Sequence, residues 1–203
     1  MVVKNSHLAA YRSGYAGLRL TADEYFALPD DGNRYELIDG VVSMSPSPLN
    51  SHQLILAEVV FQLESYVRPA KLGRVYIEAD VRLATRPDGR DLVYRPELHF
   101  VRADRLHLVG ERTTIVPDIV LEVLSDDSRG RDLITKLGDY REARVGEIWM
   151  IDPRNEVFAF YRLRGDAYEE LRPVSGKYAS AVVPGFELNL DPIRALFRAI
   201  GGG

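Results

Sequence analysis

The 203-residue chain contains no cysteine, and this absence excludes both a disulfide framework and a thiolate metal site. It also contains no apolar run long enough to cross a membrane, and no signal peptide opens it. We therefore expect a cytoplasmic protein with no membrane partner.

The sequence also lacks an excess of basic residues. Its formal net charge is -4 and its pI is about 5.6. Domains that coat nucleic acid are usually basic, so this charge balance argues against a protein that coats nucleic acid. It does not exclude an enzyme with a local basic patch. The hydrophobic and charged contents, 46% and 28%, are those of a soluble globular protein. We expect a disordered tail at residues 1–18 and a single domain at residues 19–200.

Two common enzyme signatures are missing as well. The sequence has no glycine-rich phosphate loop, which leaves a nucleotide-binding enzyme without support. It has no Gly-x-Ser-x-Gly motif and no cysteine, so a hydrolase with a serine or cysteine nucleophile is equally unsupported.

Helix signals begin near the start of the expected domain. Thr21 and Glu24 form a capping-box pattern before a short helix. The spacing of apolar residues predicts long amphipathic helices at residues 51–69 and 129–144. Strands mixed with two long helices favour an α+β or mixed α/β domain.

Strand signals lie between and after these helices. Asp39-Gly40 joins two strand-like runs and is the strongest short signal for a β-hairpin. Alternating apolar residues predict one half-buried strand at residues 74–83. A further strand is predicted at residues 93–101, where Pro96 indicates an edge or a strand start.

Glu122 interrupts the apolar stretch "IVLEVL", within a strand predicted at residues 116–125. Near-continuous apolar runs are typical of strands that are covered on both faces. An unpaired ionised carboxylate in such a place costs several kcal/mol, so a lysine, another cation or a metal ion must compensate it. A buried salt bridge to an arginine is the alternative to a metal.

Four stretches together resemble the Uma-type restriction endonuclease family of the PD-(D/E)xK nuclease superfamily. They are "YFALPDDGNRYELIDGVVSMSPSPLNSHQ", "RPELHFV", "VPDIVLEVLSDDS" and "EIWMIDP". The resemblance runs from about residue 20 to about residue 190. It implies a restriction-endonuclease-like core, in which helices flank a central mixed β-sheet and the strands at 93–101 and 116–125 are neighbours.

The resemblance also implies a chemistry, the hydrolysis of DNA phosphodiester bonds with Mg²⁺ or Mn²⁺ as cofactor. Glu97 then stands at the acidic position of the first motif, and Glu122 is the acidic residue of the second. The position where the second motif usually has a lysine is Leu124 in this sequence. The resemblance implies that Lys136 on the following helix replaces that lysine. Glu97 departs from the family pattern, because the usual residue there is aspartate.

Glu36 and Asp118 are candidates for further metal ligands. Glu36 lies in the stretch "YELIDG", and its alternative role is an ion pair with Arg34 or with a helix. Asp118 shares a strand face with Glu122, but four residues of strand separate the two by roughly 13 Å. Both can hold one ion only if the backbone bulges.

Other polar residues are candidates for contacts with a phosphate or for hydrogen bonds to the residues that bind the metal. His52 is one, although a lone histidine is more often a capping or core residue. Arg129 and Arg131, together with Arg141 and Arg144, can form a local basic patch or simply a solvated helix face. The alternative for Lys136 is a lysine at the border of an apolar helix face with its ammonium in water.

Two functions follow from these patterns. The first is a metal-dependent DNA endonuclease, for which we expect a homodimer because two cuts in a duplex suit a two-fold pair of sites. The second is a catalytically inactive relative that binds nucleic acid or protein. Glu97, in place of the usual aspartate, is the feature that favours the second.

Overall fold

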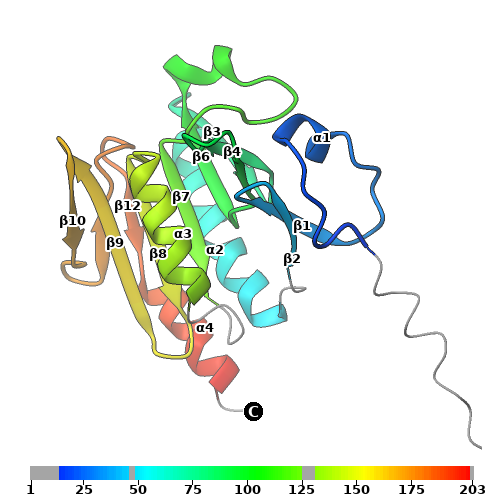
Figure 1. Cartoon of the computed structure of the whole chain (residues 1–203). Helices are drawn as coiled ribbons and strands as arrows, with labels where there is room; N and C mark the ends of the chain where they lie inside the picture. Colours follow the sequence, from blue (N-terminus) through cyan, green and yellow to red (C-terminus); the bar gives the residue numbers. More distant parts are fainter. Residues whose placement is uncertain (1–13, 46–48, 125–130, 202–203) are drawn as a thin grey trace, which may run out of the picture.

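The computed structural model describes residues 14–45, 49–124 and 131–201 (Figure 1). Residues 1–13, which make up most of the expected tail, lie outside this part. Residues 14–18 were expected to belong to the tail too, but they lie against a β-hairpin. The amide of Gly17 donates to the carbonyl of Val42 at 2.7 Å. The described domain therefore begins before residue 19.

The strands form a large sheet, a small sheet and an isolated pair. The large sheet has the order β10 (Ala167–Leu171), β9 (Val157–Arg164), β8 (Glu147–Asp152), β7 (Ile119–Val123), β6 (Leu98–Arg102) and β3 (Gly73–Ile77). The small sheet has the order β2 (Val41–Ser45), β1 (Arg34–Ile38), β5 (Asp91–Tyr94) and β4 (Val81–Thr85). The pair consists of β11 (Lys177–Ala179) and β12 (Glu187–Asn189). The large sheet is mixed, because β7 pairs in parallel with β8 and antiparallel with β6.

Helices cover both faces of the large sheet (Figure 1). On one face, α2 (Asn50–Val67) and α4 (Asp191–Gly201) pack against a core that includes Ile119, Leu121 and Val123 of β7. On the other, α3 (Arg131–Glu142) packs against Val120 of the same strand through Tyr140. This confirms the predicted α+β fold with a central mixed sheet between helices. None of the helices in the described ranges is long and apolar enough to span a membrane.

The second cluster of apolar side chains also joins the two sheets. It contains Leu83 of β4 together with Leu92 and Tyr94 of β5, packed with the α3 face of the large sheet. The outer face of the small sheet is covered by α1 (Ala22–Phe26). A 3-10 helix, η2 (Ala103–Leu108), follows β6. The small sheet is therefore bound to the large one through α3.

Local signals in the sequence are confirmed where they depend on short-range hydrogen bonds. The side chain of Thr21 accepts from the amide of Glu24, whose carboxylate accepts from the amide of Thr21, so the capping box is complete. Asp39 and Gly40 have φ angles of 49° and 75° and connect β1 to β2. Both angles lie in the left-handed region that a tight hairpin turn requires.

Two predicted strands are wrong, because each is split between the two sheets. The run at 74–83 becomes β3 and β4, and the break falls at Glu78, which has a φ of 47°. The run at 93–101 becomes β5 and β6, and the break falls at residues 95–97. Pro96 has no N–H to donate to a ladder, which favours an interruption there.

The two breaks are hydrogen-bonded to each other. The amide of Glu78 donates to the carbonyl of Glu97 at 3.0 Å. The prediction that the strands at 93–101 and 116–125 are neighbours is nevertheless correct, since β6 pairs directly with β7. The chain thus crosses between the sheets twice at one place, and both crossings carry a glutamate.

His99 makes the fold sensitive to acid. The side chain is fully buried in β6 and stacks on Tyr76, and its Nε2 lies 3.1 Å from Thr113 Oγ1. Burial lowers the pKa of His99 from 6.5 to about 4. Folding therefore favours the neutral ring, and this contribution to stability is present above pH 6.5 and is lost as the pH falls towards 4.

We expect His99→Phe to flatten this dependence. The two pKa values correspond to about 3 kcal/mol of unfolding free energy. Urea unfolding across the same pH range measures it: the wild type should lose about 3 kcal/mol more than the variant. Parallel curves for the two proteins would show that His99 does not titrate in this way.

Candidate active site

Four glutamates meet where the two sheets join. Glu36 lies in β1 of the small sheet and Glu122 in β7 of the large one, and both are buried. Glu78 and Glu97 lie at the two strand breaks. The pairing of β6 with β7 ends at Leu98 and Leu121, and Glu97 and Glu122 are the next residues beyond this pair on the two chains. The charge of Glu122 contributes to the raised pKa of Glu97, which is consistent with two neighbouring carboxylates.

Lys136 of α3 lies between the sheets and contacts one carboxylate from each. Its Nζ lies 2.7 Å from Oε1 of Glu36 and 3.5 Å from Oε1 of Glu122. Burial by itself would lower the pKa of Lys136, but the charges of Glu122 and Glu36 outweigh it and raise this pKa above its ordinary value. The ammonium is therefore charged at neutral pH, and the alternative of a lysine with its ammonium in water does not hold.

Glu122 is held through one of its two oxygens. The hydroxyl of Tyr140 donates to Oε1 at 2.5 Å, and Lys136 approaches the same atom. Burial raises the pKa of Glu122, opposed by the Lys136 charge and by the hydrogen bond from Tyr140. No side chain among the described residues is hydrogen-bonded to Oε2. The carboxylate is thus fixed in orientation with one oxygen available to a ligand.

Glu97 is the least compensated carboxylate of the group. Its Oε1 lies 3.5 Å from Nε2 of His52. Its Oε2 is buried and has no hydrogen-bond partner among the described residues. Burial, followed by the charges of Glu122 and Glu78, raises the pKa of Glu97 to about 8. Without a bound cation, this carboxyl group therefore carries a proton at neutral pH.

His52 is a buried supporting residue rather than a free ligand. Its Nε2 lies 2.6 Å from the carbonyl oxygen of Val123, the residue that follows Glu122. Burial lowers the pKa of His52, so the ring is neutral at neutral pH, and Nε2 must carry the proton that it donates to this carbonyl. The contact ties α2 to the end of β7 beside Glu97.

Glu78 also belongs to the group, although no pattern in the sequence selects it. Arg34 Nη1 donates to its Oε1 at 2.8 Å, and Gln53 Nε2 donates to the same atom at 3.0 Å. Burial tends to raise the pKa of Glu78, but these two hydrogen bonds lower it below its ordinary value. Of the two partners considered above as an alternative role for Glu36, Arg34 is wrong, because it pairs with Glu78, and a helix is correct, because Lys136 of α3 pairs with Glu36.

The charges of the group do not balance. When all four carboxylates are ionised, they face two cationic side chains, Lys136 and Arg34, and His52 is neutral. The surplus is then two negative charges, the charge of one divalent cation, and in the metal-free protein the proton on Glu97 reduces this surplus to one. Hard cations prefer oxygen ligands, and Oε2 of Glu97 and Oε2 of Glu122 have no hydrogen-bond partner among the described residues. The residues present therefore fit Mg²⁺ or Mn²⁺.

The protein ligands for such an ion are few. Within residues 14–45, 49–124 and 131–201, no group of three or more acidic or histidine side chains is arranged to hold a metal. Mg²⁺ is commonly held by one or two carboxylates and keeps several waters. Glu97 and Glu122 meet that smaller requirement. Glu36, considered above as a ligand, has its Oε1 engaged by Lys136 and by the amide of Arg95 at 3.0 Å, but its Oε2 has no hydrogen-bond partner among the described residues, so it stays a candidate for a further ligand.

Asp118 is not brought to this group. Its Oδ1 accepts from Arg105 Nη1 at 2.7 Å, and its Oδ2 accepts from the amide of Arg102 at 2.9 Å. The ladder from Ile119 to Val123 is regular, so the bulge that would bring Asp118 towards Glu122 is missing from this strand. Asp118 instead fixes the start of β7 to the segment that contains η2.

The proposed basic patch is described only in part. Arg129 lies outside the described residues, as does the side chain of Arg131. The guanidinium of Arg141 lies 4.6 Å from the ring centre of Tyr161, and Arg144 pairs with Asp166 at 2.9 Å. Arg141 and Arg144 thus have partners away from the glutamates.

Two supporting residues were missed by sequence reasoning for different reasons. Tyr140 has the helical spacing of an apolar core residue in the predicted helix at residues 129–144, and it does lie in the core. A buried tyrosine nevertheless needs a partner for its hydroxyl, and the buried Glu122 was the available signal. Glu78 gave no signal, because the alternation of apolar residues continues across the break at this position.

The model of the Uma2 family, described as "Putative restriction endonuclease", matches residues 22–191. The chain belongs to this family. Among solved structures, a similar one is described as a putative nuclease belonging to DUF820 from Anabaena variabilis, with a TM-score of 0.71 and 22% sequence identity. The match covers 88% of this chain and 99% of that one. The search of curated proteins gives no significant match.

Membership of the Uma2 family confirms the resemblance seen in the sequence. The solved structure supports the restriction-endonuclease-like fold of the chain. Together they support a nuclease function in general terms.

We expect Lys136→Met to destabilise the metal-free protein. The substitution leaves Glu36 and Glu122 buried without their shared cation, and breaking a buried ion pair costs about 3–5 kcal/mol. Lys177→Met is the matched control, because Lys177 pairs with Glu187 at an exposed site where such a pair contributes little. Urea unfolding at neutral pH with a chelator measures both. Equal unfolding midpoints for the two variants would contradict the buried role of Lys136.

Proposed function

We propose that the protein is a metal-dependent endonuclease that hydrolyses phosphodiester bonds of DNA in the cytoplasm. The observation that carries this proposal is the group of carboxylates at the sheet junction, which has two surplus negative charges when all are ionised, together with Oε2 of Glu97, which is buried without a partner in the described part of the chain. Such a surplus is costly unless a cation neutralises it. In a nuclease family, the natural candidates are Mg²⁺ and Mn²⁺.

Glu97 and Glu122 would hold the ion. When bound, the ion would polarise the phosphate, favour ionisation of a water and neutralise charge at the leaving oxygen. Tyr140 and Lys136 hold Oε1 of Glu122, which leaves the other oxygen for the ion. His52 of α2 holds the strand next to Glu122 in place through its hydrogen bond to the Val123 carbonyl.

Lys136 would stabilise the negative charge that develops on the phosphate. The raised pKa of its ammonium makes it a poor proton acceptor at neutral pH, so it acts as a fixed charge and not as a base. Glu36 keeps the ammonium in place when substrate is absent. Lys136 thus occupies the role usually filled by the second-motif lysine, although it comes from α3 instead of β7.

Duplex cleavage requires two cuts, so we propose that the active form is a homodimer with two-fold symmetry. Sedimentation at micromolar concentration with a DNA duplex measures this directly. A protein that stays monomeric while it cuts both strands would contradict it.

The alternative is a non-catalytic module that binds nucleic acid or protein. Glu97 in place of the family's usual aspartate favours it, as does the missing three-residue ligand cluster in the described part of the chain. In that case the buried charges serve only to join the sheets. Cleavage of DNA separates this function from the first.

The decisive assay is cleavage of supercoiled plasmid with Mg²⁺ or Mn²⁺. We expect nicking by the wild type, none with a chelator, and none by Glu122→Gln because it removes a charged ligand. Glu187→Gln changes an exposed carboxylate and is the matched control. Lys136→Met, assayed at a temperature where circular dichroism shows it folded, should cut about 100-fold more slowly.

Two outcomes would contradict the endonuclease. One is equal nicking by wild type and Glu122→Gln, which marks a contaminant. The other is metal-dependent retention of DNA in a gel without cleavage, which supports the binding module.

A further inference from the structure

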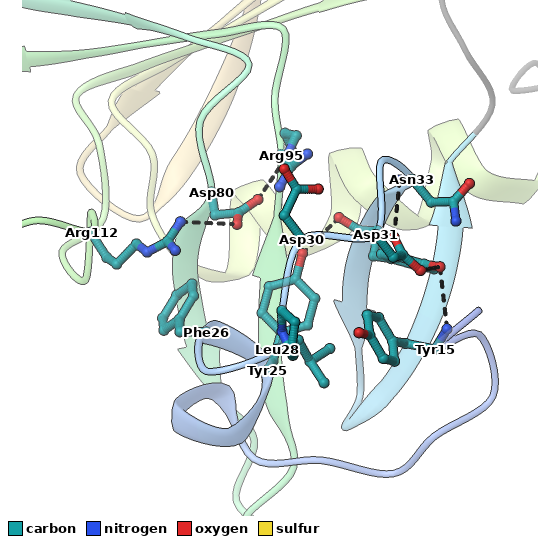
Figure 2. A pocket seen from close by; sticks show the side chains of 12 residues that line it. Tyr15, Tyr25, Phe26, Leu28, Asp30, Asp31, Asn33, Asp80, Arg95 and Arg112 are labelled. Atoms are coloured by element: carbon teal, nitrogen blue, oxygen red, sulfur yellow. Dashed lines mark hydrogen bonds and ion pairs between the residues drawn. The ribbon is translucent and has the colours of Figure 1, made fainter.

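A polar pocket lies on the α1 side of the small sheet (Figure 2). Its volume is about 270 Å³. Sites for drug-sized molecules are usually about 300–1,000 Å³, so this pocket suits a ligand of modest size such as one nucleobase with its sugar. Tyr25, Phe26 and Leu28 line one part of it, and Asp80, Arg95 and other polar residues line the rest.

The pocket and the glutamate group are connected through the break between β5 and β6. The backbone amide of Arg95 donates to Glu36 in the candidate active site, at 3.0 Å. The side chain of the same residue lines the pocket. Glu97 follows two residues later. The pocket and the glutamates therefore lie on opposite faces of the small sheet, and the Arg95 segment contributes to both.

The pocket offers hydrogen-bond donors that are fixed in place. The buried carboxylate of Asp80 accepts from Nε of Arg95 at 2.7 Å and lies 3.7 Å from Nη1 of Arg112. The Nη atoms of Arg95 have no hydrogen-bond partner among the described residues. A guanidinium held on one edge presents its remaining N–H groups as a rigid fork, which suits a planar ligand with two neighbouring acceptors.

The pocket also offers acceptors. Asp30 accepts from the amide of Gly32 through Oδ1, at 2.9 Å, and its Oδ2 has no partner in the described part of the chain. Asp31 accepts from the hydroxyl of Tyr35 at 2.7 Å and from the amide of Asn33. With Asp80, the lining carries three carboxylates against two arginines. This balance disfavours a phosphate and favours a neutral ligand with both donors and acceptors.

Flat apolar surface completes the site. Phe26 is half-buried, and the guanidinium of Arg112 lies 5.5 Å from the centre of its ring. Figure 2 shows Phe26 and Tyr25 below the polar residues that surround Asp80. Aromatic rings and guanidinium planes are the surfaces on which unpaired nucleobases stack.

We infer that this pocket binds an unpaired guanine base. Guanine carries two acceptors, O6 and N7, on one edge, for which an arginine fork is the commonest partner. It carries N–H donors on the opposite edge, which the free oxygen of Asp30 can accept. The inference extends the proposed function, since Arg95 would hold a base with its side chain while its backbone amide binds Glu36 of the candidate active site. The ligand can be a guanine within a strand or a free nucleoside.

The test is an NMR chemical-shift titration of the Glu122→Gln protein, which leaves added strands intact, with neutral nucleosides. We expect saturable binding of guanosine at millimolar concentrations or below. Adenosine and cytidine should bind about tenfold more weakly, since they lack the paired acceptors and donors. Phe26→Ala should weaken guanosine about tenfold through lost stacking, whereas Phe61→Ala, at an exposed phenylalanine of α2, should not.

Asp30→Asn provides a second variant at an exposed position that leaves the fold intact. It should weaken guanosine and narrow the gap between guanosine and inosine, which lacks the 2-amino group. Asp166→Asn is the exposed control. A single-stranded oligonucleotide with one guanine that displaces guanosine identifies a base within a strand as the ligand, and failure to displace identifies the free nucleoside.

Three results would overturn the inference: no saturable binding of guanosine, equal binding of all nucleosides, or unchanged binding by Phe26→Ala and Asp30→Asn. The proposed nuclease fails separately, because plasmid cleavage is measured on the wild type without nucleosides. Guanosine binding without plasmid cleavage would support the guanine pocket and contradict the nuclease function. Plasmid cleavage without guanosine binding would support the nuclease function and contradict the guanine pocket.

Discussion

The position of the Lys136 ammonium between Glu36 and Glu122 is the contact on which the rest of the site depends. The three residues come from β1 of the small sheet, β7 of the large sheet and α3. Arg86 adds a second link of this kind, because it follows β4 and pairs with Asp139 of α3. The two sheets are therefore joined by charge as well as by apolar packing. The same contacts fix the orientation of Glu122.

The surplus of carboxylates has opposite consequences for stability and for binding. Glu97 has a pKa of about 8 in the folded protein, against an ordinary value of 4.5. Its protonated form is favoured by folding, so this contribution to stability is present below pH 4.5 and is lost as the pH rises towards 8. A divalent cation would replace the proton and remove that penalty. The feature that weakens the metal-free fold at high pH is the one that attracts the ion.

Much of the fold was predictable, because it follows from local patterns and from the resemblance to a family. The capping box at Thr21 and the turn at Asp39-Gly40 depend on neighbouring residues only. The need of Glu122 for a partner followed from its apolar surroundings, and a lysine is that partner. The strand breaks were not predictable in the same way. The left-handed φ of Glu78 is set by the crossing between sheets, which no local pattern records.

The central claim is that Glu97 and Glu122 hold one divalent cation, and a crystal structure grown with Mn²⁺ tests it most directly. The anomalous signal of manganese locates the ion independently of the refined protein. We expect one peak within about 2.0–2.6 Å of an oxygen from each of the two carboxylates, with waters completing the coordination. A crystal with Mn²⁺ at saturating concentration and no peak between them, or with the Glu97 carboxyl group turned away from Glu122, would contradict the account.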